Sequence, residues 1–390
     1  MRFALLGCDE KTAQIAEWIA RTEKHTVNAV YQPGDYARTL ADLYPAADMD
    51  DGWEASLLNK DIDAVIVGYV PSGTMEMEQR ADQLRKLVQE SVPTLLVHPA
   101  CESIVAFELE MIRPDTNCPL VAYVPNKYHS AFVAFCDAVR ESDDSIGTVE
   151  QIVVTRCSTN RDRQTVLRLL AEDSMLITEM IGDVKTVSAA GATGEDNTNL
   201  ANLSVTFVGD AAAGARWSIE PAGHFDGVKL SAIANRGKTS LILPEDGTNA
   251  SLIVDGKTEL TDKWSTDFAI ADAANRLEAL INGDDATPTD LARSFHSLEI
   301  VDAVTQSCRR KRAIELLAEQ PTEEDTFKAM MAAGGCGMLI WTLVLVVLGP
   351  LLFMTGSVVV RIAWYVLLIG PISVFLGLQL LRFVFDDKET

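Results

Sequence analysis

The 390-residue sequence has few positive charges and no closely spaced cysteine pair, and each of these shortages argues against a class of protein. Lys and Arg number 33 against 56 Asp and Glu, which leaves a formal net charge of −23. A nucleic-acid-binding surface needs clustered basic residues, so we expect no nucleic acid partner. The seven cysteines are scattered without a Cys-x-x-Cys pair. This pattern argues against a zinc site or a disulfide framework and favours a reduced, cytoplasmic setting.

Several motifs of known chemistry are also missing. The sequence has no Gly-x-Ser-x-Gly nucleophile turn, no P-loop and no internal repeat. His224-Phe225-Asp226 lacks partners at metal-ligand spacing and is more typical of a turn, so we expect no metal site. The N-terminal apolar run is too short for a signal peptide and is better explained as a strand.

That first strand ends in a turn typical of nucleotide binding. Phe3-Ala4-Leu5-Leu6 stops at Gly7 and an amphipathic helix follows, as at the first strand of a parallel α/β sheet. Compared with Gly-x-Gly-x-x-Gly, the turn keeps Gly7 but has Asp9 and Thr12 in the other glycine positions. Acidic residues at a helix N-terminus suit the dipole but repel a diphosphate. We expect the cofactor contacts of this turn from Gly7, Cys8, Asp9 and Thr12.

Residues 1–122 alternate strand-like and helix-like segments. The runs that predict strands are Arg2–Leu6, Thr26–Tyr31, Ala64–Gly68, Thr94–Val97 and Leu120–Val124. Helical patterns lie at Thr12–Arg21, Thr74–Gln89 and Ser103–Ile112. This alternation predicts an α/β domain with a Rossmann-like, doubly wound parallel sheet. In a dinucleotide site of this kind, an acid after the second strand holds the ribose, and here Gln32 takes that place.

Residues 123–317 show a different, β-rich pattern. Seven runs predict strands: Gln151–Arg156, Thr186–Ala190, Leu203–Val208, Ala215–Ile219, Gly227–Ala232, Ser240–Leu243 and Ala250–Val254. Long helices are predicted at Thr165–Ile181, Asp267–Ile281 and Thr289–Cys308. Consecutive strands joined by tight turns predict an α+β domain with a large, mostly antiparallel sheet and helices on one face.

Several segments resemble one known family. Asp61-Ile62-Asp63-Ala64-Val65-Ile66-Val67, with Val70-Pro71 after it, is similar to a strand of the glucose–fructose oxidoreductase, inositol dehydrogenase and rhizopine-catabolism (Gfo/Idh/MocA) family. Further similar segments follow in family order at Leu120–Tyr123, Ile146–Ile152, Met180–Ala189 and Ser297–Ala303. The resemblance implies binding of NAD or NADP and hydride transfer on a sugar-like or polyol hydroxyl. It also implies a homo-oligomer formed through the sheet of the second domain.

The resemblance places a first catalytic candidate at Val97-His98-Pro99. The family has Glu-Lys-Pro there, and its lysine binds substrate and moves a proton. His98 is a candidate general base because a histidine titrates near neutral pH. The alternative is a histidine at a strand end that is hydrogen-bonded to nearby backbone. By the same resemblance, Pro71, Pro99 and Gln32 complete the cofactor-binding set.

A second landmark of the family is a helix-borne histidine that accepts the substrate proton. Counting back from Gly182, this position falls on Glu172 or Asp173, with no histidine nearby. A carboxylate in a cleft can serve as a base if its pKa rises, whereas the alternative is an acidic pair on an exposed helix face. Lys127 stands where the family often has an arginine near the substrate, and we expect it to bind an anionic group.

The C-terminal stretch has two long uncharged runs. Charge is absent from Ala329 to Val360 and from Ile362 to Leu381, on either side of Arg361. Each run exceeds the about 20 residues that cross a bilayer as a helix. We therefore predict a linker over 318–335 and a transmembrane helical hairpin over 336–385.

Basic residues predict the orientation of this hairpin. Those before it are Arg309, Arg310, Lys311, Arg312 and Lys328, and those after it are Arg382 and Lys388. By the positive-inside rule both ends face the cytoplasm. We expect a two-pass C-terminal anchor in the inner (cytoplasmic) membrane, with the lipid bilayer as partner and the soluble domains in the cytoplasm.

Three functional hypotheses remain open from the sequence. The first is a membrane-anchored oxidoreductase that uses NAD or NADP. The second is a catalytically inactive relative that binds a nucleotide or another ligand, or serves as a scaffold at the membrane, because neither usual proton-transfer residue is present. The third is that Arg309–Arg312 and the hairpin recruit an acidic soluble module to a membrane complex.

Overall fold

The computed structural model describes most of the chain up to Leu316. The described residues are 1–49, 52–54, 57, 61–70, 75–140, 146–191, 200–211, 213–223, 225–245, 249–263, 266–283, 289–316, 342, 345, 364 and 366–368. The chain divides into two compact units, Met1–Ala318 and Glu319–Thr390.

The first sheet of unit Met1–Ala318 has six parallel strands in the order β3-β2-β1-β4-β5-β6. The strands are β1 Arg2–Leu6, β2 Thr26–Tyr31, β3 Asp48–Met49, β4 Ala64–Val67, β5 Thr94–Val97 and β6 Leu120–Tyr123. Strands β4, β5 and β6 are buried along their whole length, as expected where helices cover both faces of a parallel sheet. This is the strand order of the doubly wound dinucleotide-binding fold.

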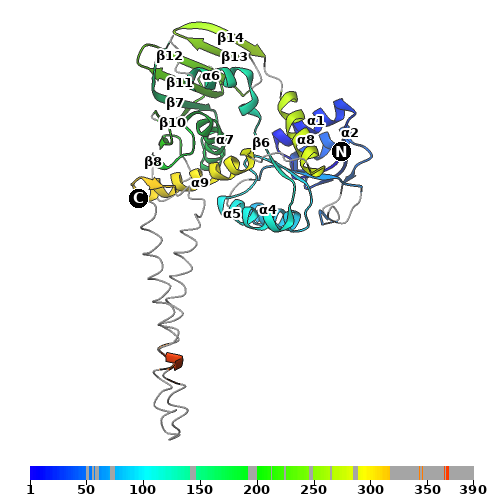
Figure 1. Cartoon of the computed structure of the whole chain (residues 1–390). Coiled ribbons are helices and arrows are strands. Elements are labelled where there is room, and N and C mark those ends of the chain that lie inside the picture. Colours follow the sequence, from blue (N-terminus) through cyan, green and yellow to red (C-terminus); the bar gives the residue numbers. More distant parts are fainter. Residues whose placement is uncertain are drawn as a thin grey trace. The chain divides into compact units, whose positions relative to one another are not determined.

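Helices from distant parts of the chain cover the two faces of this sheet (Figure 1). The helices concerned are α1 Glu10–Thr22, α2 Ala37–Leu43, α4 Met75–Gln89, α5 Ser103–Thr116, α8 Asp267–Ile281 and α9 Thr289–Arg310. α1 and α8 share one apolar core with the sheet, through residues such as Ile15 and Leu277. α4, α5 and α9 share the opposite core, through residues such as Leu84 and Phe295. The Rossmann-like domain is therefore completed by helices from beyond residue 266.

The second sheet has nine strands in the order β14-β13-β12-β11-β7-β10-β9-β8-β15. Its strands are β7 Val149–Ser158, β8 Thr186–Ala190, β9 Ser204–Val208, β10 Gly214–Pro221, β11 Gly227–Ala234, β12 Lys238–Pro244, β13 Asn249–Val254, β14 Lys257–Lys263 and β15 Ile314–Glu315. Among the described strand pairs of this sheet, only the central pair β7–β10 is parallel. The expected large, mostly antiparallel sheet is confirmed.

One face of the second sheet is packed against helices. These are α6 Ser130–Arg140 and α7 Arg163–Ile181, together with α9; the short helix η2 Pro125–Tyr128 contacts α6, α7 and α8. Alternate side chains of β10, Ala215, Trp217 and Ile219, enter this core, while Arg216, between the first two, is exposed. Among the described residues, no helix covers the opposite face of the sheet, to which Arg216 and the other alternate side chains point (Figure 1).

The strand bounds expected for β1, β2 and β5 are confirmed, and several short or edge elements were missed. α2, β3, β14 and β15 were absent from the sequence prediction. β3 and β15 have two residues each and exist through pairing with β2 and β8. Such short strands carry no hydrophobic period, so no local signal could reveal them.

The hairpin predicted over 336–385 lies almost entirely outside the described residues of unit Glu319–Thr390. Its six described residues are helical, and the indole N–H of Trp364 donates to the carbonyl of Leu345 at 3.1 Å. Within the part of the chain that the structure describes, no helix has the length and apolar character to cross a membrane.

Candidate functional site

Two glycines lie at the point where the first sheet reverses its winding. β1 pairs with β2 on one side and β4 on the other, and the helices that follow these strands, α1 and α4, pack against opposite faces of the sheet, which is the topology at which such sheets bind ligands. Gly7, with φ of 75°, donates its N–H to Tyr31. A Cβ on Gly68 would lie 2.7 Å from the Thr12 Oγ1 and 2.9 Å from the Gly7 carbonyl oxygen. Only glycine permits these two turns to approach so closely.

The N-terminus of α1 is capped by its own aspartate. Asp9 Oδ1 accepts from the Thr12 backbone N–H at 2.9 Å and from the Thr12 hydroxyl at 2.5 Å. A dinucleotide diphosphate normally binds at such a helix N-terminus. The Asp9 carboxylate already takes one of its donors and repels an anion there. Beside it, burial raises the pKa of the Cys8 thiol to about 12, with Asp9 adding to the effect, which makes Cys8 an unreactive neutral thiol.

A buried arginine lies against this turn. Arg80 on α4 is only 1% exposed, and a Cβ built on Gly7 would overlap its Nη2. Its Nε and Nη1 have no hydrogen-bond partner among the described residues. Burial lowers the pKa of Arg80 to about 10, an effect that the nearby Asp9 carboxylate opposes. Arg80 thus remains a cation at neutral pH, without an ion-pair partner in the described structure.

Sequence reasoning missed Arg80, although a signal was present. Met77, Ala81, Leu84 and Val88 form the buried stripe of α4, and Arg80 falls on the same side of the helix. A charged residue within an apolar stripe needs a partner or a function. The sequence marked the whole segment only as a helix.

The side chain of Gln32 is held by the same helix. Gln32 follows β2 with a positive φ of 53°, and its Oε1 accepts from the Gln83 amide at 3.2 Å. Gln83 is 1% exposed, and its own Oε1 has no donor among the described residues. α4 therefore presents Arg80 to the end of β1 and Gln83 to the end of β2, the two strand ends that flank a dinucleotide.

His98 lies in a buried, fully bonded position after β5. It is 2% exposed; Nδ1 lies 2.6 Å from the Ser294 hydroxyl, and Nε2 lies 3.1 Å from the Ser297 hydroxyl and 3.3 Å from the Ala171 carbonyl. Because a carbonyl only accepts, Nε2 carries the proton and Nδ1 accepts from Ser294. Burial lowers the pKa of His98 to about 4, and Lys11 acts in the same direction. His98 joins β5 to α7 and α9 as a neutral ring.

Glu172 and Lys11 form an ion pair between the nucleotide turn and α7. Lys11 Nζ lies 2.8 Å from Glu172 Oε1 and donates to the His98 carbonyl at 3.5 Å. Arg168 reaches the same carboxylate at 3.1 Å. Burial alone would raise the pKa of Glu172, but Lys11 and Arg168 lower it to about 2. Glu172 is ionised and 8% exposed, so the alternative of an exposed acidic pair is wrong for this residue.

Asp173 is adjacent in sequence and points elsewhere. It is fully buried, forms an ion pair with Arg156 on β7, and accepts from the Trp217 indole at 2.8 Å. Successive residues of a helix point about 100° apart, so Glu172 faces the first domain while Asp173 faces the second sheet. The structure keeps Asp173 within the core of the second domain, away from the nucleotide turn.

Lys127 also forms ion pairs with acidic residues of the protein itself. Its ammonium contacts Asp290 and lies 2.8 Å from Glu179. Asp290 further accepts from the Tyr128 hydroxyl at 2.5 Å and binds Arg276 at 2.5 Å. This network connects η2 to α7, α8 and α9, so Lys127 forms its described ion pairs with acidic side chains of the protein itself.

A cavity of about 280 Å³ lies between the first domain and the helices of the second. Its first-domain wall includes Tyr69 and Pro99, and its second-domain wall includes Arg168 and Asp302. The Arg168 guanidinium lies 5.8 Å from the centre of the Tyr69 ring. Its size suits a small metabolite. Of the predicted site residues, Pro99 lines this cavity, while Pro71 lies outside the described residues.

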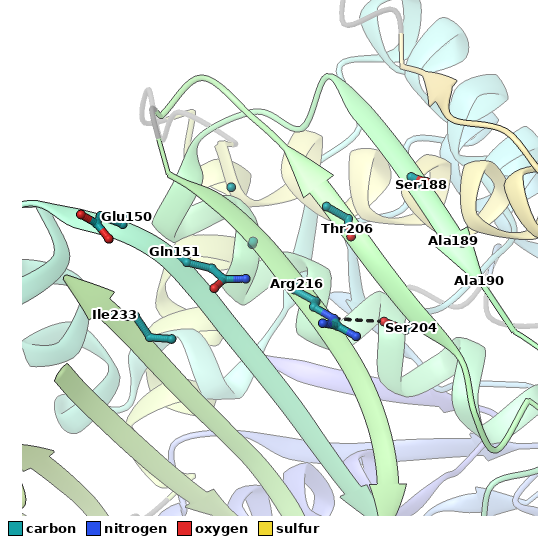
Figure 2. A pocket seen from close by; sticks show the side chains of 11 residues that line it. Glu150, Gln151, Ser188, Ala189, Ala190, Ser204, Thr206, Arg216 and Ile233 are labelled. Atoms are coloured by element: carbon teal, nitrogen blue, oxygen red, sulfur yellow. Dashed lines mark hydrogen bonds between the residues drawn. The ribbon is translucent and has the colours of Figure 1, made fainter. Parts of the chain in front are cut away.

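A wider, shallower hollow of about 720 Å³ lies on the helix-free face of the second sheet. Figure 2 shows outward side chains of β7 to β11 around it, including Gln151, Thr206 and Arg216. Arg216 donates to the Ser204 hydroxyl at 3.3 Å. This is the face through which the family resemblance predicts oligomer contacts, and that expectation remains a prediction.

No protein family model matches the sequence, and no curated protein matches it. Solved structures do match. A myo-inositol dehydrogenase from Corynebacterium glutamicum is 16% identical with a TM-score of 0.61, over 82% of this chain and 99% of its own. The chain has the fold of the inositol dehydrogenases. An oxidoreductase from Agrobacterium radiobacter, solved with NAD+, L-tartaric acid and magnesium, is 13% identical with a TM-score of 0.60, over 81% and 98% of the chains.

A biliverdin reductase from Synechocystis, solved with biliverdin and NADP+, gives a TM-score of 0.60 at 14% identity, over 79% and 99% of the chains. The structural neighbours are thus oxidoreductases of the Gfo/Idh/MocA type, and the predicted resemblance is confirmed for the fold. In this chain the orphaned guanidinium of Arg80 fits an anionic dinucleotide, whereas the Asp9 cap opposes one. Among the described residues, no group of three His, Cys, Asp or Glu is arranged to hold a metal ion.

Proposed function

We propose that this protein is a membrane-anchored oxidoreductase that binds NAD or NADP in its first domain. The observation that carries the proposal is the glycine pair at the switch point of a β3-β2-β1-β4-β5-β6 sheet. In parallel α/β sheets, ligands bind outside the carboxyl ends of the strands at this point. Gly7 and Gly68 allow the two turns to pack closely there, and Arg80 places positive charge beside Gly7.

The cofactor, when bound, would supply or accept the hydride, and Lys11, paired with Glu172, would bind the substrate oxygen. Lys11 brings an ammonium to the carbonyl of His98, the position at which the resembled family has its lysine. The paired Glu172 is a weak base because its pKa is about 2. The Lys11 ammonium would donate a hydrogen bond to the substrate carbonyl oxygen and polarise that carbonyl for hydride addition, with the proton taken from solvent water, which favours reduction of a carbonyl over oxidation of an alcohol. The substrate class is a sugar-like or polyol-related carbonyl compound in the cavity beside Tyr69.

A second candidate function is ligand binding without hydride transfer. Two observations favour it: His98 is neutral and saturated by hydrogen bonds, and Glu172 is held by two cations. Neither residue is then free to accept a substrate proton at neutral pH. In this case the protein would be a sensor or scaffold with a nucleotide site.

Calorimetry and absorbance separate the two candidates. Unit Met1–Ala318 contains the three apolar cores formed by the described residues, so residues 1–318 should fold alone. Titration with NAD+, NADP+ and their reduced forms should give micromolar binding, about −8 kcal/mol. Loss of absorbance from the reduced nicotinamide in the presence of keto-sugars, abolished by Lys11→Met, supports the oxidoreductase. Binding with no turnover supports the second candidate, and no binding at millimolar cofactor rejects both.

The membrane anchor is part of the proposal and rests on the two uncharged runs on either side of Arg361. The contact between Trp364 and Leu345 joins residues of the two runs, as a helical hairpin would. The full chain should sediment with membranes after a carbonate wash, whereas residues 1–318 should stay in the supernatant. Protease added to the outside of intact cells should leave the soluble domains uncut. Release of the full chain by carbonate would contradict the anchor.

A homo-oligomer through the helix-free face of the second sheet remains an expectation from the family resemblance. Residues 1–318 should then scatter light as a dimer or larger species, and Thr206→Arg, which places a long cation in the hollow of Figure 2, should weaken the association. A monomer at micromolar concentration would contradict this part of the proposal.

A further inference from the structure

The buried guanidinium of Arg80 is unexplained by the protein's own contacts. A charge removed from water destabilises a fold unless an opposite charge or hydrogen-bond acceptors replace the lost hydration. Arg80 is 1% exposed, and two of its three nitrogens have no acceptor among the described residues. Arg156, the other deeply buried arginine among the described residues, is satisfied by ion pairs with Asp173 and Glu245. Arg80, which lacks such partners among the described residues, lies where the first sheet reverses its winding, between β1 and β4.

The position of Arg80 relative to the α1 turn suggests which group it would bind. Its Nη2 lies beside Gly7, where the backbone of a dinucleotide fold normally meets the diphosphate. A backbone N–H that would usually bind the diphosphate here, that of Thr12, instead donates a hydrogen bond to Asp9 Oδ1. An anion beside Gly7 would therefore meet a side-chain cation where it usually meets backbone N–H groups.

We propose that Arg80 receives a phosphate group of the dinucleotide, so that phosphate recognition in this chain has moved from the glycine-rich backbone of the turn to a buried side chain of α4. The inference rests on the proposed dinucleotide site and adds the residue that holds the anion. A guanidinium offers two parallel N–H groups to a phosphate, a geometry that Lys cannot reproduce. Arg80 also offsets the repulsion that the Asp9 carboxylate exerts on the same phosphate.

Arg80 could bind either of two phosphate groups of the cofactor, and the experiment distinguishes them. The diphosphate, common to NAD and NADP, is the group expected beside Gly7. The 2′-phosphate of NADP is expected near the end of β2, where Gln32 replaces the usual acid and binds Gln83, one helical turn from Arg80. Arg80 at the diphosphate affects both cofactors equally, whereas Arg80 at the 2′-phosphate affects NADP alone.

The test is calorimetric titration of residues 1–318 with NAD+, NADP+ and inorganic diphosphate, in wild type and in Arg80→Met, Arg80→Lys and Lys86→Met. Lys86 is the matched control, because it is an exposed cation on the same helix that contacts Trp53 and Glu54. Arg80→Met should weaken the binding of NAD+ and NADP+ at least about tenfold, the effect of losing a charged hydrogen bond. Arg80→Lys should recover part of the loss, and Lys86→Met should bind as wild type does.

The ligand-free variants supply a second readout that a merely structural arginine would not give. If Arg80 is kept for a ligand, Arg80→Met should raise the Tm of the free protein, because an unpaired buried charge is removed. The same variant should lose the rise in Tm that cofactor or diphosphate gives to wild type. A lower Tm in the free variant together with unchanged cofactor binding would overturn the inference.

Failure of the inference and failure of the proposed function give different results. Dinucleotide binding that is unaffected by Arg80→Met keeps the proposed function and rejects the role of Arg80. No dinucleotide binding, with diphosphate stabilising wild type but not Arg80→Met, rejects the proposed function and keeps Arg80 as a phosphate-binding residue. Absence of any binding or stabilisation by all three ligands rejects both.

Discussion

Arg156 on β7 and Asp173 on α7 form a bidentate ion pair that is buried from solvent. Nε of Arg156 donates to Asp173 Oδ2 at 2.9 Å and Nη2 donates to Oδ1, and the exposed fractions of the two side chains are 1% and 0%. The Trp217 indole adds a third donor to the carboxylate. The pair fixes the rotation of α7 on the second sheet, which in turn directs Glu172 toward the nucleotide turn.

We predict that Asp173→Ala destabilises residues 1–318 by about 3–5 kcal/mol, because Arg156 is left buried without its main counter-charge. Urea unfolding followed by tryptophan fluorescence measures the change. The double variant Arg156→Met/Asp173→Leu should recover most of the loss, since it leaves no buried charge behind. A decrease in the free energy of unfolding of less than about 1 kcal/mol in Asp173→Ala would contradict a buried ion pair.

The buried His98 predicts a specific sensitivity to acid. Its pKa is about 4 in the folded protein and returns to its ordinary value of 6.5 on unfolding. Between these values the unfolded chain binds a proton that the folded protein does not, so the free energy of unfolding falls as pH drops from 6.5 to 4. The expected slope is up to about 1.4 kcal/mol per pH unit. His98→Gln, which keeps a donor and an acceptor, should remove this contribution in urea titrations at several pH values, and equal slopes would disprove it.

We predict that Lys11 and Glu172 are strongly coupled. The pair is mostly buried, with side-chain exposed fractions of 21% and 9%, and it joins the turn after β1 to α7. A double-mutant cycle with Lys11→Met and Glu172→Gln should give a coupling energy of about 1–3 kcal/mol. Lys24 and Glu278, exposed at 55% and 41%, provide the control pair, for which about 0–1 kcal/mol is expected. Equal coupling energies in the two pairs would contradict a strong interaction between the turn after β1 and α7.

Gly68 predicts a steric effect at the switch point. An alanine there would place its Cβ 2.7 Å from the Thr12 Oγ1 and 2.9 Å from the Gly7 carbonyl oxygen. Gly68→Ala should lower stability by about 1–3 kcal/mol through overpacking and should weaken cofactor binding. A methyl group added at Gly223 would meet no atom of the described residues within 4 Å, so Gly223→Ala should leave both unchanged. A stable Gly68→Ala with normal binding would show that the turns can separate without loss.

Much of the fold could be predicted from the sequence because its signals are local. The apolar runs ending at Leu6, Tyr31 and Val97 predicted the bounds of β1, β2 and β5 as the structure has them. Their alternation with helical patterns predicted the parallel sheet. The return of α8 to the first domain was missed, because hydrophobic periodicity indicates that a face is buried but not which element covers it.

The candidate site was only partly predictable. Glu172 and Asp173 were singled out together, but the sequence could not assign one to the cleft and the other to the core. Lys127 was expected to bind an anionic ligand, and the structure shows the anions it binds to be Asp290 and Glu179. Each of these outcomes depends on partners that are distant along the chain and adjacent only after folding.

By itself, the sequence determined the element types, the change from an alternating to a β-rich pattern and the loss of the usual catalytic lysine and histidine, because these follow from residue identity and short-range period. Only the tertiary structure decided the electrostatics. Burial and partners from distant elements make His98 neutral, keep Glu172 ionised and leave Arg80 charged but unpaired among the described residues. Charge states in a protein interior depend on desolvation and on neighbours brought together by folding, and neither is recorded in the order of residues.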